Sequence, residues 1–262
     1  MAVVLVGILN ITPDSFSDGG SFLDPEIACR HAFQLVEDGA EYVDIGADST
    51  RPGSRCVGVE EEWRRLEPVL RILQAKLPLS IDTHHSEIAR RAIDYGVSII
   101  NDVSAGQDTA MFEVVKKAAL RIVLMHSRYS SPHDFEVCSQ QTPAQNIVEE
   151  VCDSLQIKLD KACNAGISPD QVILDSGFGA FISSDPRDSD RLVQNYDVLQ
   201  RFNCDLMLGI SRKGFLGAAG AKTLPERDVL SARYAAQILE ALRAEQVLYV
   251  RAHNVAIHRE ML

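Results

Sequence analysis

The sequence has few positive charges and no long hydrophobic run. It carries 26 lysine and arginine residues against 37 aspartate and glutamate residues, a formal net charge of −11 at pH 7. General nucleic-acid binding and attachment to a membrane surface both require a basic face. No stretch approaches the ~18 consecutive apolar residues of a membrane-spanning helix. We therefore expect no nucleic-acid partner and no membrane, although a local cationic pocket for an anion is compatible with this charge.

The cysteines lack the spacing of a metal or redox site. They are Cys29, Cys56, Cys138, Cys152, Cys163 and Cys204, and none forms a CxxC pair. A disulfide framework is typical of much shorter chains with more cysteine. Residues 1–9 contain neither the basic region nor the cleavage site of an export signal, and they are better explained as a first strand. The sequence predicts reduced thiols and a cytoplasmic location.

Eight short apolar runs occur along the chain, and helical patterns fill most of the gaps. Consecutive apolar residues, without alternation, are typical of strands buried on both faces. Eight strand-then-helix units predict an α/β fold, a single (β/α)8 barrel, and the length suits one domain over residues 1–262. The runs are residues 3–9, 42–46, 79–82, 97–101, 121–125, 171–175, 205–209 and 247–251.

Three helical patterns are clear, at residues 60–76, 143–164 and 226–245. The first starts with three glutamates and is expected to end near Lys76, before Pro78. Gly166 is expected to close the second. Two long connections, 10–24 and 47–59, follow strands, so we expect mobile loops over the active face.

Nearly every apolar run ends on a polar residue that can do chemistry. In a (β/α)8 barrel the carboxyl ends of the strands form the active face, so these side chains should converge. A plainer reading of Asp82, Asn101 and Asp175 is that they cap the helices that follow. The residues at these ends are Asn10, Asp48, Asp82, Asn101, His126, Asp175, Ser211 with Lys213, and Arg251 with His253. His84 and His85 lack partners at metal-ligand spacing and are expected to lie at the surface or at the start of a helix. His126 is expected to pack or to support the site and not to carry a proton.

Six strings in the sequence are specific enough to compare with known families. They are residues 10–20 (NITPDSFSDGG), 44–53 (DIGADSTRPG), 80–83 (SIDT), 100–103 (INDV), 124–126 (LMH) and 209–213 (GISRK). These strings resemble signatures of the dihydropteroate synthase family of pterin-binding enzymes. They occur in the family's order, and the resemblance runs from about residue 5 to about residue 255. The resemblance implies a transferase of folate biosynthesis. It would join 6-hydroxymethyl-7,8-dihydropterin pyrophosphate to p-aminobenzoate and release pyrophosphate.

The resemblance also implies which residues hold the pterin. Asp175 looks like the carboxylate that accepts two donors from the guanine-like edge, and Asn101 offers a donor and an acceptor beside it. Lys213 is similar to the lysine that donates to the carbonyl side of the pterin. Asp82 resembles the carboxylate that lies beside the ring and offsets positive charge when the leaving group departs.

The diphosphate is expected to meet positive charge. Arg251 and His253 look like the family's phosphate-binding pair, and in an extended segment residues two apart point the same way. A Mg²⁺ ion bridging the pyrophosphate and Asn10 would add Lewis-acid assistance. Preorganised cations here would supply the main catalytic effect.

The resemblance implies that the second substrate binds near Thr50, Arg51 and Pro52, with Phe16 and Ser211 close by. The departures from the family pattern cluster there, and the clearest is Ala180 in place of an aromatic residue, although Phe181 follows directly. We therefore expect a reshaped pocket, with slow use of p-aminobenzoate or weak inhibition by sulfonamides.

Two other functions stay open at this stage. A pterin-binding paralogue would hold the ring without catalysis. A corrinoid-linked methyltransferase domain would bind methyltetrahydrofolate in a related barrel, but it would need no pyrophosphate site. The resemblance also implies a homodimer formed through barrel helices.

Overall fold

Eight parallel strands close into a barrel in chain order, with β8 next to β1. The computed structural model describes residues 2–12, 24–48, 57–129, 146–243 and 245–262. The strands are β1 (Ala2–Asn10), β2 (Tyr42–Gly46), β3 (Leu79–Asp82), β4 (Val97–Asp102), β5 (Arg121–Met125), β6 (Val172–Asp175), β7 (Asp205–Leu208) and β8 (Val247–Ala252). The predicted (β/α)8 fold is confirmed, and each strand lies within one residue of its predicted bounds.

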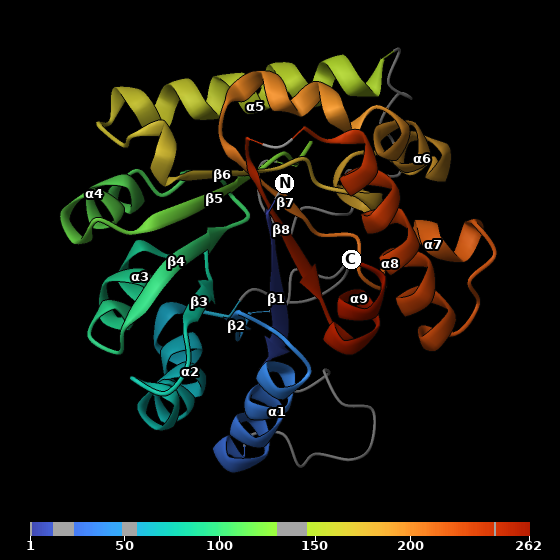
Figure 1. The fold of residues 1–262 in the computed structure, drawn as a ribbon. Coiled ribbons are helices and arrows are strands. Elements are labelled where there is room, and N and C mark those ends of the chain that lie inside the picture. Colours follow the sequence, from blue (N-terminus) through green and yellow to red (C-terminus); the bar gives the residue numbers. More distant parts are fainter. Residues whose placement is uncertain (1, 13–23, 49–56, 130–145, 244) are drawn as a thin grey trace.

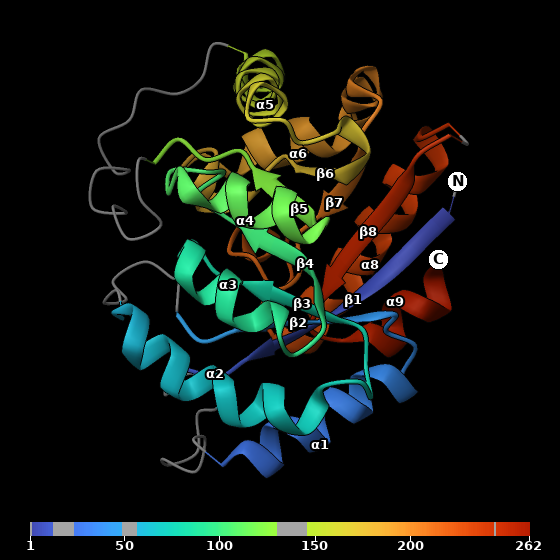
Figure 2. The ribbon, with the colours of Figure 1, turned by 90° about the vertical axis from the view of Figure 1, so that its left-hand side faces the viewer.

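Helices surround the strands (Figure 1). They are α1 (Pro25–Glu37), α2 (Val59–Leu73), α3 (Ser86–Ile93), α4 (Ala110–Ala118), α5 (Ile147–Asn164), α6 (Pro186–Gln194), α7 (Phe215–Ala218), α8 (Leu224–Ala241) and α9 (Val255–Met261), with short 3-10 helices η2 (Pro169–Gln171), η3 (Gly179–Phe181) and η4 (Tyr196–Phe202). Both chain ends lie on the same side in Figure 2.

Several helix bounds differ from their predictions. The helix α5 begins at Ile147 and not at 143, because the Asn146 side chain caps it by accepting from the Glu149 backbone N–H. The helix α2 ends at Leu73 and not near Lys76, because Gln74 turns to an extended ψ of 138° and Ala75 takes a left-handed φ of 57°. The helix α8 ends at Ala241 and not at 245, because Leu242 is extended with ψ 147°. Gly166, at φ 89°, follows α5 as predicted, since glycine adopts a positive φ without strain.

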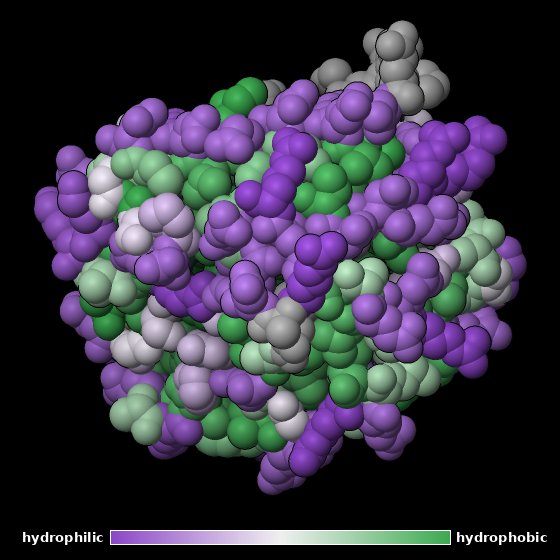
Figure 3. Space-filling view, turned by 45° about the horizontal axis from the view of Figure 1, so that its top comes forward, coloured by the Kyte–Doolittle hydropathy of each residue, from purple (hydrophilic) through white to green (hydrophobic). Residues whose placement is uncertain are grey.

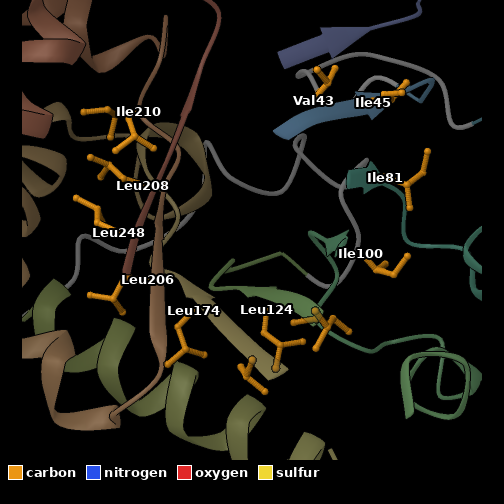
Figure 4. Close-up of a cluster of buried hydrophobic side chains, with 14 of the residues drawn as sticks. Val43, Ile45, Ile81, Ile100, Leu124, Leu174, Leu206, Leu208, Ile210 and Leu248 are labelled. Atoms are coloured by element: carbon orange, nitrogen blue, oxygen red, sulfur yellow. The ribbon is translucent and has the colours of Figure 1, made fainter. Parts of the chain in front are cut away.

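Alternating strand side chains build two apolar layers. Side chains that point outward pack against the helices, and Figure 4 labels several of them, among them Val43, Ile81 and Leu248. Side chains that point inward form a separate cluster inside the barrel: Val6, Ile99, Val123, Ile173, Met207 and Tyr249. Each fully buried side chain of this size contributes about 1.5–3 kcal/mol, so both layers stabilise the barrel that carries the site.

A charged pair lies at the amino end of the barrel. Arg121 and Asp205 are the first residues of β5 and β7, and Arg121 Nη2 donates to Asp205 Oδ2 over 2.6 Å. Arg121 also donates to the Tyr249 hydroxyl. This end of a (β/α)8 barrel usually serves stability, which leaves the carboxyl end for function.

Polar and apolar residues are mixed on the outer surface that Figure 3 shows. Figure 3 shows one face, on which hydrophobic areas in green are interrupted by hydrophilic residues in purple. The large hydrophobic side chains that are exposed among the described residues are Phe33, Ile157, Leu224 and Met261. Within those ranges, no helix combines the length and apolar character that crossing a membrane requires.

Candidate active site

The carboxyl ends of β1 to β4 bring polar residues side by side. Asn10 on β1 is the register partner of Gly46, which in turn is the partner of Asp82 on β3. Asp82 is next to Asn101 on β4. The expected convergence of strand ends is therefore present on this half of the barrel.

Asp44, in the middle of β2, holds this group together. It is fully buried, and its carboxylate accepts from Ser80 Oγ at 2.5 Å and from Asn101 Nδ2 at 2.9 Å. Its third partner is Arg251, whose Nε lies 2.6 Å from Oδ2. Hydrogen bonds to a carboxylate are charge-assisted, so Asp44 fixes the orientation of three side chains at once.

Arg251 bridges two carboxylates. Its Nη2 donates to Asp82 Oδ2 over 2.7 Å while its Nε contacts Asp44. Burial raises the pKa of Asp82 to about 7; Arg251 opposes this shift and Asp44 reinforces it. Gly46 leaves the room that Asp82 needs, because a Cβ there would lie 3.3 Å from the Asp82 Cβ.

Asp175 ends β6 at the same mouth. Its Oδ1 accepts from the Gly177 backbone at 2.8 Å. A Cβ on Gly209 would come within 3.1 Å of Oδ2, so the glycine makes space for the carboxylate. Burial raises the pKa of Asp175, and Lys213, Gly177 and Arg251 oppose the rise. Asp175 and Arg251 therefore act on each other at one end of the barrel.

Lys213 follows β7 and reaches toward Asp175. Its Nζ donates to the Phe178 carbonyl over 3.2 Å and lies 4.7 Å from the centre of the Phe181 ring. Burial lowers the pKa of Lys213 to about 8, with Asp175 opposing and Arg251 assisting the shift. The lysine is thus held at the site as a cation of unusually low pKa.

His253 is directed to a different part of the mouth from Arg251. Its backbone N–H donates to Ser211 Oγ over 3.1 Å, and its Nδ1 lies 3.0 Å from the same oxygen. Arg251 instead contacts Asp44 and Asp82, on β2 and β3. We expected the two side chains to point the same way, but their hydrogen bonds go to different parts of the mouth. The reason is that β8 ends at Ala252, so His253 is no longer in the strand.

Helix capping does not explain the polar strand ends. The N-cap of α3 is His85 and that of α4 is Thr109, so Asp82 and Asn101 do not cap the helices that follow them. Asp175 makes a local turn through Gly177 and no helix cap. Their convergence at the mouth therefore favours a binding role.

Three histidines near the strand ends have structural surroundings. His85 Nδ1 lies 2.7 Å from the buried carboxylate of Glu62, and the ring of His84 lies 4.0 Å from the ring of His85. His126 is buried, and burial, assisted by Lys158 and Arg128, lowers its pKa to about 3. A neutral, buried His126 fits the packing role expected from the sequence.

Asp44 and Ser80 were not among the expected site residues. Both lie inside strands, where the apolar pattern predicts only core. For Asp44 the available signal was a charged residue in the middle of a strand with two buried faces. An unpaired charge there is strongly disfavoured, so Asp44 had to have partners.

A metal would have few protein ligands in the described part of the site. Asn10 is an even number of positions from Val4 and Val6, which belong to the inner cluster, so it faces the barrel axis. Among the described residues, no group of three or more histidine, cysteine, aspartate or glutamate side chains could hold a metal ion. The Asn10 amide offers the kind of oxygen ligand that Mg²⁺ takes in proteins.

The part expected to bind a second substrate is described only in part. Thr50, Arg51, Pro52 and Phe16 lie outside the described residues, as do most of the loops 10–24 and 47–59. Among described residues, the Tyr129 hydroxyl donates to the Ala180 carbonyl over 2.6 Å. The Tyr129 ring packs edge-on against Phe181, at 6.5 Å between centroids. An aromatic pair from the loops after β5 and β6 thus lies beside Lys213.

The fold and this arrangement define a barrel enzyme with a carboxylate-rich binding mouth, and comparisons identify its family. Residues 6–251 match the family described as pterin binding enzyme. Dihydropteroate synthase type-3 of Escherichia coli is 34% identical over 253 residues, which cover 96% of this chain and 94% of that protein.

Solved structures that resemble this chain belong to proteins of the same name. Dihydropteroate synthase of Xanthomonas albilineans with 4-aminobenzoic acid is 35% identical, with a TM-score of 0.86, covering 99% of this chain and 90% of that one. The same enzyme in complex with 7,8-dihydropteroate gives a TM-score of 0.83 at 32% identity, covering 99% and 91%. The chain belongs to the pterin binding enzyme family.

Proposed function

We propose that this chain is a dihydropteroate synthase of folate biosynthesis. It would condense 6-hydroxymethyl-7,8-dihydropterin pyrophosphate with p-aminobenzoate and release pyrophosphate. The observation that carries the proposal is the convergence of Asp175, Asn101 and Lys213 with the Asp44–Arg251–Asp82 network at one mouth. Supporting it, relatives that match nearly the whole chain carry this activity in their names, and two such structures hold 4-aminobenzoic acid or 7,8-dihydropteroate.

The pterin binds through its polar edge. The Asp175 carboxylate accepts from two donors of the guanine-like edge, a charge-assisted contact that a buried site strengthens. Asn101 already donates one N–H to Asp44, which leaves its carbonyl oxygen and second N–H for the ring. The Lys213 ammonium lies close enough to Asp175 to lower the pKa of that carboxyl. From this position Lys213 donates to the pterin carbonyl.

The slow step is cleavage of the carbon–oxygen bond to pyrophosphate. Negative charge grows on the leaving oxygens, while the ring shares the positive charge left on the methylene. The two bonds from Arg251 to carboxylates use two of its five N–H groups, so others can contact phosphate oxygens. Asp82 accepts a hydrogen bond from the Arg251 guanidinium and offsets the positive charge on the ring. His253 donates to the phosphates from the β7 side of the mouth.

A Mg²⁺ ion held by Asn10 and the diphosphate would supply Lewis-acid assistance to the departing oxygens. Asn10 faces the axis next to Gly46 and Asp82, so its amide oxygen is on the correct side of the barrel. This role is tested by turnover across a Mg²⁺ titration with the wild type and with Asn10→Ala, whose Mg²⁺ requirement should rise.

The amine of the second substrate then attacks the methylene. Ser211 and the pair Tyr129–Phe181 lie near this position, and Thr50 and Arg51 would complete the pocket. Because Ala180 lacks a ring and Phe181 is held by Tyr129, we propose a reshaped pocket that uses p-aminobenzoate slowly or resists sulfonamides. Steady-state kinetics with both compounds test this point, and ordinary constants for each would contradict it.

The decisive experiment is a turnover assay. Purified protein with the pterin pyrophosphate, p-aminobenzoate and Mg²⁺ should release pyrophosphate and form 7,8-dihydropteroate in equal amounts. Binding of the pterin pyrophosphate by calorimetry without any release would instead indicate a non-catalytic pterin-binding protein. Binding of methyltetrahydrofolate with methyl transfer to a corrinoid would support the methyltransferase alternative, but Arg251 and His253 suit a phosphate-bearing ligand better.

The protein is further proposed to act as a single domain over residues 1–262, as a homodimer and in the cytoplasm. Light scattering of the purified protein at micromolar concentration tests the dimer. Limited proteolysis tests whether one cooperative core spans the chain, and fractionation of the producing cells tests the location.

A further inference from the structure

The residue before Lys213 has an unfavourable backbone conformation. Arg212 takes a φ of 60°, in the left-handed region that non-glycine side chains rarely adopt because the Cβ crowds the backbone. Such a conformation persists only where the surroundings enforce it. Here it separates two side chains: Arg212 turns to α8, while Lys213 turns to the Phe178 carbonyl in the active site.

Two neighbouring residues of α8, Arg227 and Asp228, hold Arg212 in this conformation. Arg212 Nε and Nη2 donate to Asp228 Oδ1 and Oδ2 over 2.7 and 2.8 Å, a bidentate pair. Arg227 Nη1 donates to the Arg212 carbonyl over 3.4 Å. Asp228 is buried, with only 2% of its surface exposed, so losing its partner would leave a charge in the protein interior. Arg212 is thus held by its side chain and by its backbone.

Asp228 is linked to α9 through Ser231, which lies on α8. Ser231 Oγ donates to the Asp228 carbonyl over 2.9 Å and lies 3.2 Å from His258 Nε2. His258 Nδ1 in turn contacts the Asn254 carbonyl over 2.8 Å. These contacts join the turn of α8 that carries Asp228 to α9.

We infer that Asp228 is a positioning residue for the pterin site: through its ion pair with Arg212 it holds the backbone turn that directs Lys213 toward Asp175. Asp228 touches no substrate in this account. Its effect is on the fraction of molecules in which Lys213 is in place, and the inference rests on the proposed pterin-binding function.

The first test is Asp228→Asn, which keeps the size of the side chain but places an N–H against the guanidinium. We expect kcat/KM for the pterin pyrophosphate to fall about tenfold, mainly through a higher KM, since Lys213 binds the ring. Asp205→Asn is the matched control, because it breaks an Arg–Asp pair of similar length at the opposite end of the barrel. It should leave KM unchanged.

A pair of double variants separates positioning from general stability. In the Asp228→Asn background, Arg212→Gly removes the Cβ that makes a positive φ unfavourable, whereas Arg212→Ala keeps it. Both double variants lack the ion pair, so the loss of stability that comes from the missing pair is shared. The glycine variant should recover most of the lost affinity, and the alanine variant should not. Equal KM values for the two would overturn the inference.

The chemical reactivity of the Lys213 amine gives a readout that does not depend on enzyme turnover. Competitive labelling with acetic anhydride, followed by peptide mass spectrometry, gives the pH at which Lys213 becomes reactive. In the wild type Lys213 is surrounded by Asp175, Arg251 and the Phe181 ring, and burial holds its pKa near 8. In Asp228→Asn the amine should move toward water, and its midpoint should rise by about one unit toward the ordinary lysine value.

The outcomes distinguish the two levels of proposal. If the wild type forms no 7,8-dihydropteroate, the proposed function fails, and the labelling result still reports whether Asp228 places Lys213. If the wild type is active but Asp228→Asn has the KM and labelling midpoint of Asp205→Asn, the inference fails and the function stands.

Discussion

Arg251 Nε donates to Asp44 Oδ2 over 2.6 Å, and the two residues lie 207 positions apart in the sequence. Because β1 stands between β8 and β2, this pair reaches across one strand of the closed barrel. The same guanidinium contacts Asp82. The Arg251 side chain therefore links β8 to β2 and β3 at the candidate site.

Replacing Asp44 with asparagine should destabilise both the fold and the site. The substitution keeps the shape but removes the charge that accepts from Arg251, Asn101 and Ser80. Breaking a buried ion pair in this way costs about 3 kcal/mol, at the lower end of the usual range because Arg251 retains Asp82. Urea unfolding measures the loss, and the KM for the pterin pyrophosphate should rise with it.

Ser80→Ala is the control for Asp44→Asn. It removes one neutral donor from the same carboxylate, so its cost should be about 1 kcal/mol. If the two variants lost equal stability, the charge of Asp44 would not be the important feature.

The stability of the protein should depend on Asp82 between pH 4 and 7. Its pKa is about 3.8 when unfolded and about 7 when folded, so over this range the folded state binds more protons. The free energy of unfolding attributable to Asp82 therefore falls as pH rises from about 4 to about 7. Asp82→Asn should lack this decline, so its stability relative to the wild type should improve steadily across the range in urea unfolding series.

A suitable comparison is Asp185→Asn, at the N-cap of α6. The pKa of Asp185 is lowered to about 2 by Arg187, so its stabilising effect is complete above about pH 5 and is lost only as pH falls further. The difference between this variant and the wild type should be flat from pH 5 to 7. A flat difference for Asp82→Asn as well would contradict the raised pKa.

Gly209→Ala should weaken pterin binding with little loss of fold stability. The added Cβ would lie 3.1 Å from Asp175 Oδ2, so the carboxylate must move away from the position that accepts the ring donors. We expect about a tenfold higher Kd for the pterin pyrophosphate by calorimetry, or about 1.4 kcal/mol. Gly214→Ala is the control, because nothing lies within 4 Å of its added Cβ and its φ of −61° suits any residue. Equal affinities for the two variants would show that Asp175 does not need this space.

Much of the fold could be predicted because most strands are short, largely apolar runs, such as 122–125, that a polar residue follows. The location of the site followed, since Asp82, Asn101 and Asp175 stand at strand ends, which a barrel gathers at one mouth. Asp44 could not be found this way, because it lies in the middle of β2 and its partners, Arg251 foremost, are distant in sequence.

Backbone details were also beyond the sequence pattern. Ala75 and Arg212 both take a positive φ, although neither is the glycine that such positions favour. In the case of Arg212 the reason is a contact with Asp228 on α8, which no local pattern encodes. The direction of the Arg251 side chain is another example, since alternation along a strand does not say which carboxylate a long side chain will reach.

The alkaline limit of activity should belong to Lys213. Burial lowers its pKa to about 8, so above this pH the free enzyme loses the cation that contacts the pterin carbonyl, and kcat/KM should fall. Lys213→Arg keeps a charge that does not titrate in this range, so its kcat/KM should be about 10–100-fold lower than that of the wild type near pH 7.5 but level to about pH 9.5. Lys158→Arg is the matched control, because Lys158 on α5 is another lysine whose pKa burial lowers, and its Nζ contacts Ser154 outside the site. That variant should keep the wild-type decline, and a decline at the same midpoint in Lys213→Arg would assign the limit to another group.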